Sequence, residues 1–184
     1  MRFTLTYEGQ LLAKGKSEHK EEIREQLHPQ LAELWTHDPL SIHPEYLQPE
    51  QEGEISVLTN VGNHVYAPLV RTRLHLVAEL DVLLLRPERP GGIVTSGGDI
   101  DNRLKTLFDA LKVPTQRQDI SPTARRSDVG SPTYTLLEDD ALIARVNVDT
   151  DRLLAAPQAD FVRLVLRVSL RARKLIYGNM NLIA

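Results

Sequence analysis

The chain contains no cysteine among its 184 residues. This absence excludes disulfide bridges, thiolate metal ligands and cysteine nucleophiles, and it is compatible with a reducing cytoplasm. A metal ion would therefore have to be bound by oxygen atoms or by imidazole nitrogens. The six histidines are scattered without the spacing of metal ligands, so we interpret them as surface or structural residues.

A long hydrophobic run is also missing. The most apolar stretch, residues 74–85, is interrupted by Glu79 and Asp81 and is too short to cross a bilayer. The first ten residues alternate polar and apolar side chains and lack the basic and apolar regions of a signal peptide. We therefore expect a soluble, cytoplasmic protein without a membrane partner.

Positive charge is not in excess, since 22 Lys and Arg against 25 Asp and Glu give a formal net charge of -3. A protein that coats nucleic acid through its overall charge normally has clustered Lys and Arg. Any contact with nucleic acid must therefore come from local basic patches. With 41% hydrophobic residues, the chain is expected to form one globular domain over residues 1–184.

Hydrophobic periodicity predicts a mixture of strands and helices. The expected strands cover residues 2–7, a hairpin of 54–59 and 65–70, and residues 72–85, 141–148 and 161–173. One expected helix is capped by Ser17 and kinks or restarts at Pro29, and the other covers residues 101–112. Residues 112–136 are rich in Pro, Ser, Thr, Arg and Gln without periodicity, so we expect a mobile insertion there.

Acidic residues occupy the ends of predicted elements, where functional residues commonly lie. The segment Asp99-Ile100-Asp101-Asn102 leads from a glycine-rich loop into the second helix, and Glu138-Asp139-Asp140 precedes a strand. Carboxylates two residues apart on an extended segment point the same way. Asp140 shares the parity of the apolar face of the following strand, which predicts that it lies on the helix-covered side, near the start of that helix.

Three carboxylates held close together normally need a cation, because two like charges about 4 Å apart repel by roughly 4 kcal/mol at an effective dielectric near 20. An all-oxygen site favours Mg²⁺ or Mn²⁺ over Zn²⁺, and such a metal supports phosphodiester hydrolysis by activating water. Lys105, one turn beyond Asp101, lies on the same edge of the predicted helix and would balance negative charge on the phosphate.

A structural interpretation of these residues stays open. Asp101 is also a suitable helix cap, beside a solvated Asp99. Lys105 fits a surface ladder of i, i+4 ion pairs with Asp101 and Asp109. The later acidic run that ends at Asp140 fits a polar turn.

The order and spacing of these residues resemble the signature of RusA-type Holliday-junction resolvases. The matching segments are Asp99-Ile100-Asp101-Asn102-Arg103-Leu104-Lys105, Phe108-Asp109-Ala110-Leu111 and Asp139-Asp140-Ala141. The resemblance implies that the catalytic metal is bound by three aspartates, Asp99, Asp101 and Asp140, and that Lys105 is also required. It further implies an α/β (α+β) fold, a small mixed β-sheet with two main helices packed on one face, and a homodimer that cuts branched DNA.

Two features depart from the family pattern. The connection across residues 112–136 is longer than usual, and the chain is acidic where a junction-binding protein is expected to be basic. We therefore expect a Mg²⁺-dependent endonuclease for branched DNA such as Holliday junctions, with alternatives. These are a nuclease for flaps, forks or RNA, and an accessory nucleic-acid-binding or regulatory domain with a vestigial metal site.

One face of the last predicted strand is the expected DNA-binding surface. Four arginines there share one parity, opposite an apolar face: Arg163, Arg167, Arg171 and Arg173. They would contact phosphates, although a solvated outer sheet face is an equally good interpretation. Further candidates lie in the 112–136 segment, namely Arg117, Arg125 and Arg126.

Overall fold

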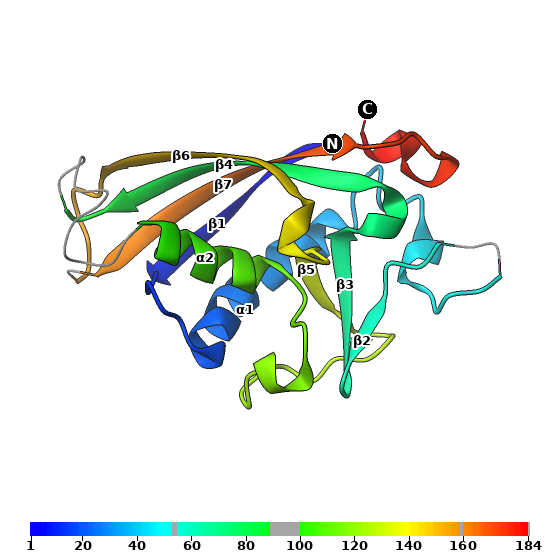
Figure 1. Cartoon of the computed structure of the whole chain (residues 1–184), viewed down its shortest axis with the longest axis horizontal. Helices are drawn as coiled ribbons and strands as arrows, with labels where there is room; N and C mark the ends of the chain where they lie inside the picture. The colour runs from blue at the N-terminus through cyan, green and yellow to red at the C-terminus, as the bar shows by residue number, and fades with distance from the viewer. Residues whose placement is uncertain (53–54, 89–99, 159, 184) are drawn as a thin grey trace.

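The structure, a computed structural model, describes residues 1–52, 55–88, 100–158 and 160–183. The chain has mixed α and β structure, with its strands arranged in two sheets (Figure 1). The α-helices are α1 (Ser17–Leu34) and α2 (Ile100–Leu111). The strands are β1 (Arg2–Gln10), β2 (Thr59–Val61), β3 (His64–Val70), β4 (Leu76–Arg86), β5 (Thr133–Leu137), β6 (Ile143–Arg152) and β7 (Phe161–Ala172). Short 3-10 turns cover Pro44–Leu47, Thr72–Leu74, Arg117–Asp119, Asp140–Leu142 and Tyr177–Leu182.

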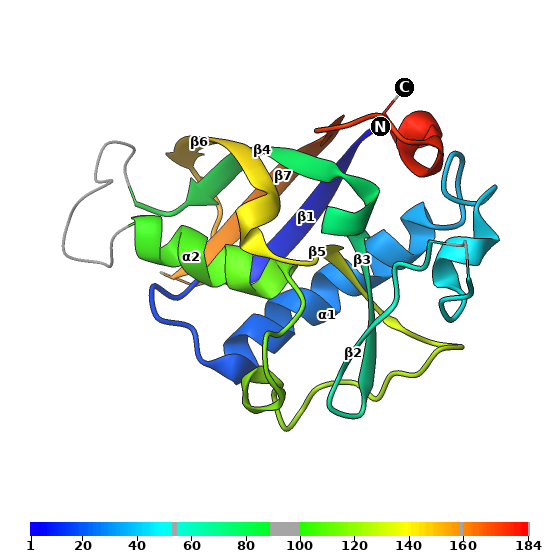
Figure 2. The ribbon, with the colours of Figure 1, turned by 45° about the vertical axis from the view of Figure 1, so that its right-hand side comes forward.

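The larger sheet has the strand order β1-β7-β4-β6. β7 runs antiparallel to both β1 and β4, whereas β6 runs parallel to β4. The register places Leu5, Leu166 and Val82 side by side across three strands, and all three are buried. This face packs against α1 and α2, which both lie on the same side of the sheet (Figures 1 and 2). The expected fold, a small mixed sheet with two helices on one face, is confirmed.

A second, smaller sheet has the order β2-β3-β5. β2 and β3 form the predicted hairpin, although β2 covers Thr59–Val61 and not residues 54–59. Gly62 has a φ of 59° at the turn, a left-handed conformation that glycine adopts without strain. β3 pairs in parallel with β5, and α1 contacts both β5 and β1. α1 therefore joins the two sheets into one core.

Residues 112–136 contain more structure than the sequence pattern indicates. Their last part belongs to β5, in which the β-branched Thr133 and the neighbouring Leu136 are buried. Upstream of β5, the buried Ser127 hydroxyl accepts a hydrogen bond from the backbone N–H of Val65 at 3.0 Å. This part of the segment therefore packs against the hairpin, and the expected mobility of the insertion stays a prediction.

α1 differs from its prediction at its first residue and at Pro29. Ser17 is its first helical residue, and the capping position is held by Lys16 without a side-chain hydrogen bond. The helix continues through Pro29 without a break, because Leu27 and Leu31 on either side are buried in the core. Packing thus outweighs the hydrogen bond that proline cannot donate. Among the described residues, no helix is long and apolar enough to cross a membrane.

Two glutamines of α1 close the free edge of β1. The Gln30 amide donates to the carbonyl of Thr6 at 2.8 Å and accepts from its N–H at 2.9 Å. Gln26 makes the same pair of contacts with Glu8, at 3.0 and 3.3 Å. The side chains therefore occupy backbone groups that an unprotected sheet edge would leave exposed, and they fix α1 beside the sheet.

His28 gives the protein a predicted pH dependence of stability. Its ring is buried, its Nδ1 accepts from the N–H of Tyr134 at 3.0 Å, and the Arg125 guanidinium contacts its Nε2. Burial and the charge of Arg125 lower the pKa of His28 below its ordinary value of 6.5, against a smaller opposing effect of Glu25. Below about pH 6.5 the unfolded chain therefore binds a proton at His28 more readily than the folded chain does. The free energy of unfolding consequently decreases as the pH falls below about 6.5.

The test compares urea unfolding at pH 7.5 and 5.5 for the wild type and for His28→Asn, which keeps an acceptor near the Nδ1 position. We expect the variant to lose less stability on acidification than the wild type. An identical pH response in the two proteins would contradict this account.

Candidate functional site

The first half of the acidic motif lies at the start of α2. The helix forms because apolar residues recur at helical spacing, and Leu107 and Leu111 bury its inner face. It begins at Ile100, so Asp101 lies in the first turn, where its side chain is exposed. One carboxylate oxygen of Asp101 accepts from the N–H of Asn102 at 2.8 Å. Asp99, the other acid of the motif, lies outside the described residues.

Lys105 is exposed one turn after Asp101, as the helical spacing predicts. The alternative of an i, i+4 ladder with Asp109 is not what the structure shows. The Asp109 carboxylate lies 2.7 Å from the Lys20 ammonium of α1 and 3.3 Å from that of Lys112. Within the described part of the chain, neither Asp101 nor Lys105 forms an ion pair. Both charges are therefore available to a ligand.

Asp140 lies in a different place from the one predicted. It belongs to the 3-10 turn Asp140–Leu142, so β6 starts only at Ile143, and one carboxylate oxygen lies 3.0 Å from the ammonium of Lys112. Lys112 directly follows the last residue of α2, whereas Asp101 is in the first turn, and eleven residues of helix rise about 16 Å. The expectation that Asp140 lies near the start of α2 is therefore wrong. β6 runs parallel to β4 and begins beside Ala78, so Asp140 lies near the start of β4, whereas α2 begins after the other end of that strand.

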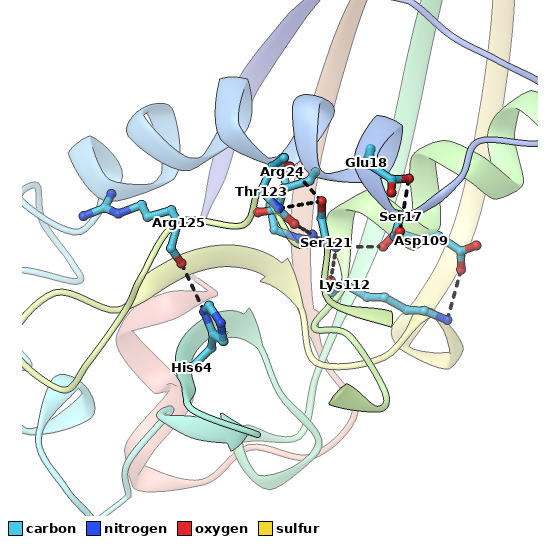
Figure 3. A network of polar contacts seen from close by, with 10 residues as sticks. Ser17, Glu18, Arg24, His64, Asp109, Lys112, Ser121, Thr123 and Arg125 are labelled. Atoms are coloured by element: carbon cyan, nitrogen blue, oxygen red, sulfur yellow. Dashed lines mark hydrogen bonds and ion pairs between the residues drawn. The ribbon is translucent and has the colours of Figure 1, made fainter. Parts of the chain in front are cut away.

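Asp109 and Lys112 belong to an ion network that joins the end of α2 to α1 (Figure 3). Burial alone would raise the pKa of Asp109, but the hydrogen bond and charge of Lys20, with the charge of Lys112, hold it below its usual range. Burial alone would lower the pKa of Lys112, but Asp140 and Asp109 raise it above its usual value. The buried Arg24 adds hydrogen bonds to the carbonyls of Asp109 and Lys112 at 3.3 and 3.4 Å. These contacts hold the last turn of α2 in place.

A cavity of about 580 Å³ lies beside this network, between the start of α1 and the end of α2. Its charged lining has cations from Lys16, Lys20, Arg24 and Lys112 and carboxylates from Glu18, Asp109 and Asp119. The sequence pattern did not indicate it, because its lining comes from segments that are remote in the chain. A smaller hollow of about 290 Å³ is lined by two of the candidate arginines, Arg117 and Arg126.

The arginines of β7 lie on one exposed face, as their parity predicts. That face is not basic, because neighbouring strands place carboxylates beside the arginines. Arg163 pairs with Glu8 of β1 at 2.7 Å, and Arg171 pairs with Glu79 of β4 at 3.2 Å. The remaining members of the predicted set are Arg167, which lies opposite Asp81, and Arg173, which follows the end of the strand. A role for these four residues in DNA binding stays a prediction.

The described residues of the chain exclude Asp99. In that set no three His, Asp or Glu side chains converge in a way that could hold a metal ion. Asp101 fits such a site, because its exposed carboxylate offers oxygen atoms of the kind that Mg²⁺ prefers. Asp140 does not fit in this conformation, since its carboxylate contacts Lys112 at the other end of α2.

Comparisons of the chain with protein-family models, with curated proteins and with solved structures found no match. The resemblance to RusA-type resolvases therefore depends on the motif residues alone.

Proposed function

We propose that the chain is a Mg²⁺-dependent endonuclease that cleaves branched DNA such as Holliday junctions, and that Mn²⁺ can replace Mg²⁺. The observation that carries this proposal is the start of α2, where Asp101 and Lys105 are exposed, free of ion pairs within the described residues, and one turn apart. The motif that contains them begins with Asp99 and matches the resolvase signature in order and spacing. The mixed sheet with two helices on one face also agrees with the fold that the resemblance implies.

Each residue has a distinct role in this proposal. Asp99 and Asp101 supply oxygen ligands, and a bound Mg²⁺ would activate water and stabilise negative charge on the phosphate. Lys105 would place its ammonium near the same phosphate from one turn further along α2. Asp140, the third ligand that the resemblance implies, would have to leave its ion pair with Lys112 at the other end of α2 to reach this metal. In line with the resemblance, the acting form is proposed to be a cytoplasmic homodimer.

One observation favours a second candidate function. The pairing of Asp140 with Lys112 gives that aspartate a structural role, as expected for an accessory nucleic-acid-binding or regulatory domain whose metal site is vestigial. Such a domain would bind branched DNA without cutting it.

A cleavage assay separates these possibilities. The purified protein is incubated with a four-way junction, a flap, a fork, a linear duplex and a single-stranded RNA, each with Mg²⁺ or with EDTA. The proposal predicts Mg²⁺-dependent cutting of the four-way junction and little cutting of the linear duplex. Preferred cutting of flaps, forks or RNA would assign a different substrate, and tight junction binding without cutting would favour the accessory domain.

A further inference from the structure

Arg86, the last residue of β4, is a buried arginine whose charge lacks a partner in the described structure. Its side chain is 6% exposed, and its Nε and Nη2 atoms are buried without a hydrogen-bond partner in the described part of the chain. Arginine stays protonated at all accessible pH values, so the charge cannot be removed by titration. Burying a charge without a partner is unfavourable, which points to an acceptor supplied by a ligand.

The side chain of Arg86 lies on the helix-covered face of the sheet. Along β4 it shares the parity of Val82 and Leu84, which are both buried on that face. The same end of the sheet holds the start of α2, as both views of the ribbon show (Figures 1 and 2). The parallel register also places Arg152 of β6 directly beside Arg86. Two arginines therefore lie side by side where β4 and β6 end, next to Asp151 in the preceding register position.

The start of α2 adds a second source of hydrogen-bond donors. The first backbone N–H groups of a helix have no backbone partner within it, and the helix dipole makes this end positive. In α2 the Asp101 carboxylate accepts from one of these groups, the N–H of Asn102, and the others remain for a ligand. α2 has 12 residues, with the exposed Asp101 in its first turn. An anion with several oxygen atoms matches both these N–H groups and the planar fork of a guanidinium.

We propose that Arg86 and the first turn of α2 form a phosphate-binding site, and that the phosphate belongs to the DNA backbone beside the metal-binding aspartates. The identity of this phosphate depends on the proposed function, whereas phosphate binding itself does not. The Asp101 carboxylate repels such a phosphate, and the charge of Arg86 offsets this repulsion when no cation is bound. Arg86 would thus hold the substrate oxygen atoms against the metal site.

The test measures phosphate binding in EDTA, so it does not require nuclease activity. Thermal unfolding is followed in sodium chloride and in sodium phosphate at matched ionic strength, and the phosphate dissociation constant is measured by calorimetry. We expect phosphate to raise the Tm of the wild type. Arg86→Met should raise the Tm in chloride, because it replaces a buried charge that lacks a partner with an apolar side chain of similar length. It should also weaken phosphate binding about tenfold or more, through loss of a charge-assisted hydrogen bond.

Arg145→Met is the matched control, because Arg145 is exposed and paired with Asp81 at 3.0 Å, and it belongs to none of the proposed binding surfaces. It should leave the phosphate response intact. A folded Arg86→Met protein with a lower Tm in chloride and an unchanged phosphate response would overturn the proposal. If Arg86→Met does not fold, phosphate affinity is measured for Arg86→Lys instead. Lysine keeps the charge but lacks the planar guanidinium fork, so phosphate should bind this variant more weakly. Unchanged phosphate affinity in Arg86→Lys would also overturn it.

A second arm identifies the source of the phosphate. Binding of a four-way DNA junction in EDTA is measured as a function of salt, and Arg86→Lys should weaken it in parallel with inorganic phosphate. Weaker phosphate binding with unchanged junction binding would overturn the assignment to DNA. Phosphate binding that depends on Arg86, in a protein that cuts no nucleic acid, would contradict the proposed function and leave the phosphate site standing.

Discussion

Asp101→Asn is expected to abolish Mg²⁺-dependent DNA cleavage and to leave the folded protein intact. The substitution removes a charged metal ligand with almost no change in volume, and the side chain is exposed in the first turn of α2. Loss of a residue that merely orients a metal ligand typically costs tenfold to a hundredfold in activity or metal affinity. Loss of the ligand itself should therefore reduce the cleavage rate at least about a hundredfold. Junction binding in EDTA should stay the same or become tighter, because a negative charge near the DNA is removed.

Asp109→Asn is the matched control for this experiment. It makes the same chemical change on the same helix, two turns away, but Asp109 contacts Lys20 and Lys112 in the network that joins α2 to α1. The control should keep cleavage per folded molecule and lose stability. Undiminished Mg²⁺-dependent cutting by folded Asp101→Asn would refute the assignment of Asp101.

Arg24→Met is expected to cause the largest loss of stability among the variants considered. Arg24 and Glu21 form an ion pair, both side chains are only 5% exposed, and Arg24 also binds two carbonyls at the end of α2. Removing one member of a buried pair leaves the other charge without compensation, which typically costs about 3–5 kcal/mol. Urea unfolding at neutral pH should show this loss.

Two companion variants test the reason for the loss. The double variant Glu21→Met, Arg24→Met removes both charges and should recover much of the lost stability, since apolar replacement of a whole buried pair is often neutral. Lys20→Met removes a cation from a more exposed pair and should cost less than about 1 kcal/mol. A loss below about 1 kcal/mol for Arg24→Met would show that the Glu21 charge is satisfied in another way.

The sequence predicted those parts of the fold that depend on regular periodicity. Alternating apolar residues placed both ends of β7 and the end of β4 within one residue, although β4 begins at Leu76 and not at Thr72, because residues 72–74 form a 3-10 turn. The recurrence of Leu104, Leu107 and Leu111 placed α2 within one residue at either end. The smaller sheet was harder to predict, because β5 is a five-residue strand inside a polar segment and its partner is remote in the chain. Short strands carry little periodic signal, and their pairing depends on tertiary contacts.

The same limit applies to the candidate site: positions within one helix could be predicted from the sequence, but contacts between elements could not. Asp101 and Lys105 follow from helical spacing, and both lie where that spacing puts them. The position of Asp140 was wrong because β6 pairs in parallel with β4 and so begins at the end of the sheet remote from the start of α2, a pairing that the pattern of one strand does not contain. The parity of the β7 arginines was right, but their acidic partners on other strands depend on the register between strands, which one strand's pattern does not contain.

The spacing of residues along the sequence also did not indicate which charged side chains are buried. Glu21 and Arg24 look like solvated residues of a helix, yet both are buried where α1 meets α2. Arg86 likewise follows an apolar strand and reads as its polar end, yet it is buried on the helix-covered face. Each position depends on what packs against it, which only the assembled fold provides.

The central claim, that the start of α2 binds a divalent metal, is tested most directly by a crystal structure with Mn²⁺ and its anomalous scattering. The account predicts a Mn²⁺ ion about 2.0–2.2 Å from a carboxylate oxygen of Asp101, with Asp99 as a second ligand. The ion should be missing from Asp101→Asn crystals grown in the same way. A wild-type structure in which millimolar Mn²⁺ leaves Asp101 without a metal, or an ion that persists in the Asp101→Asn crystals, would contradict the claim.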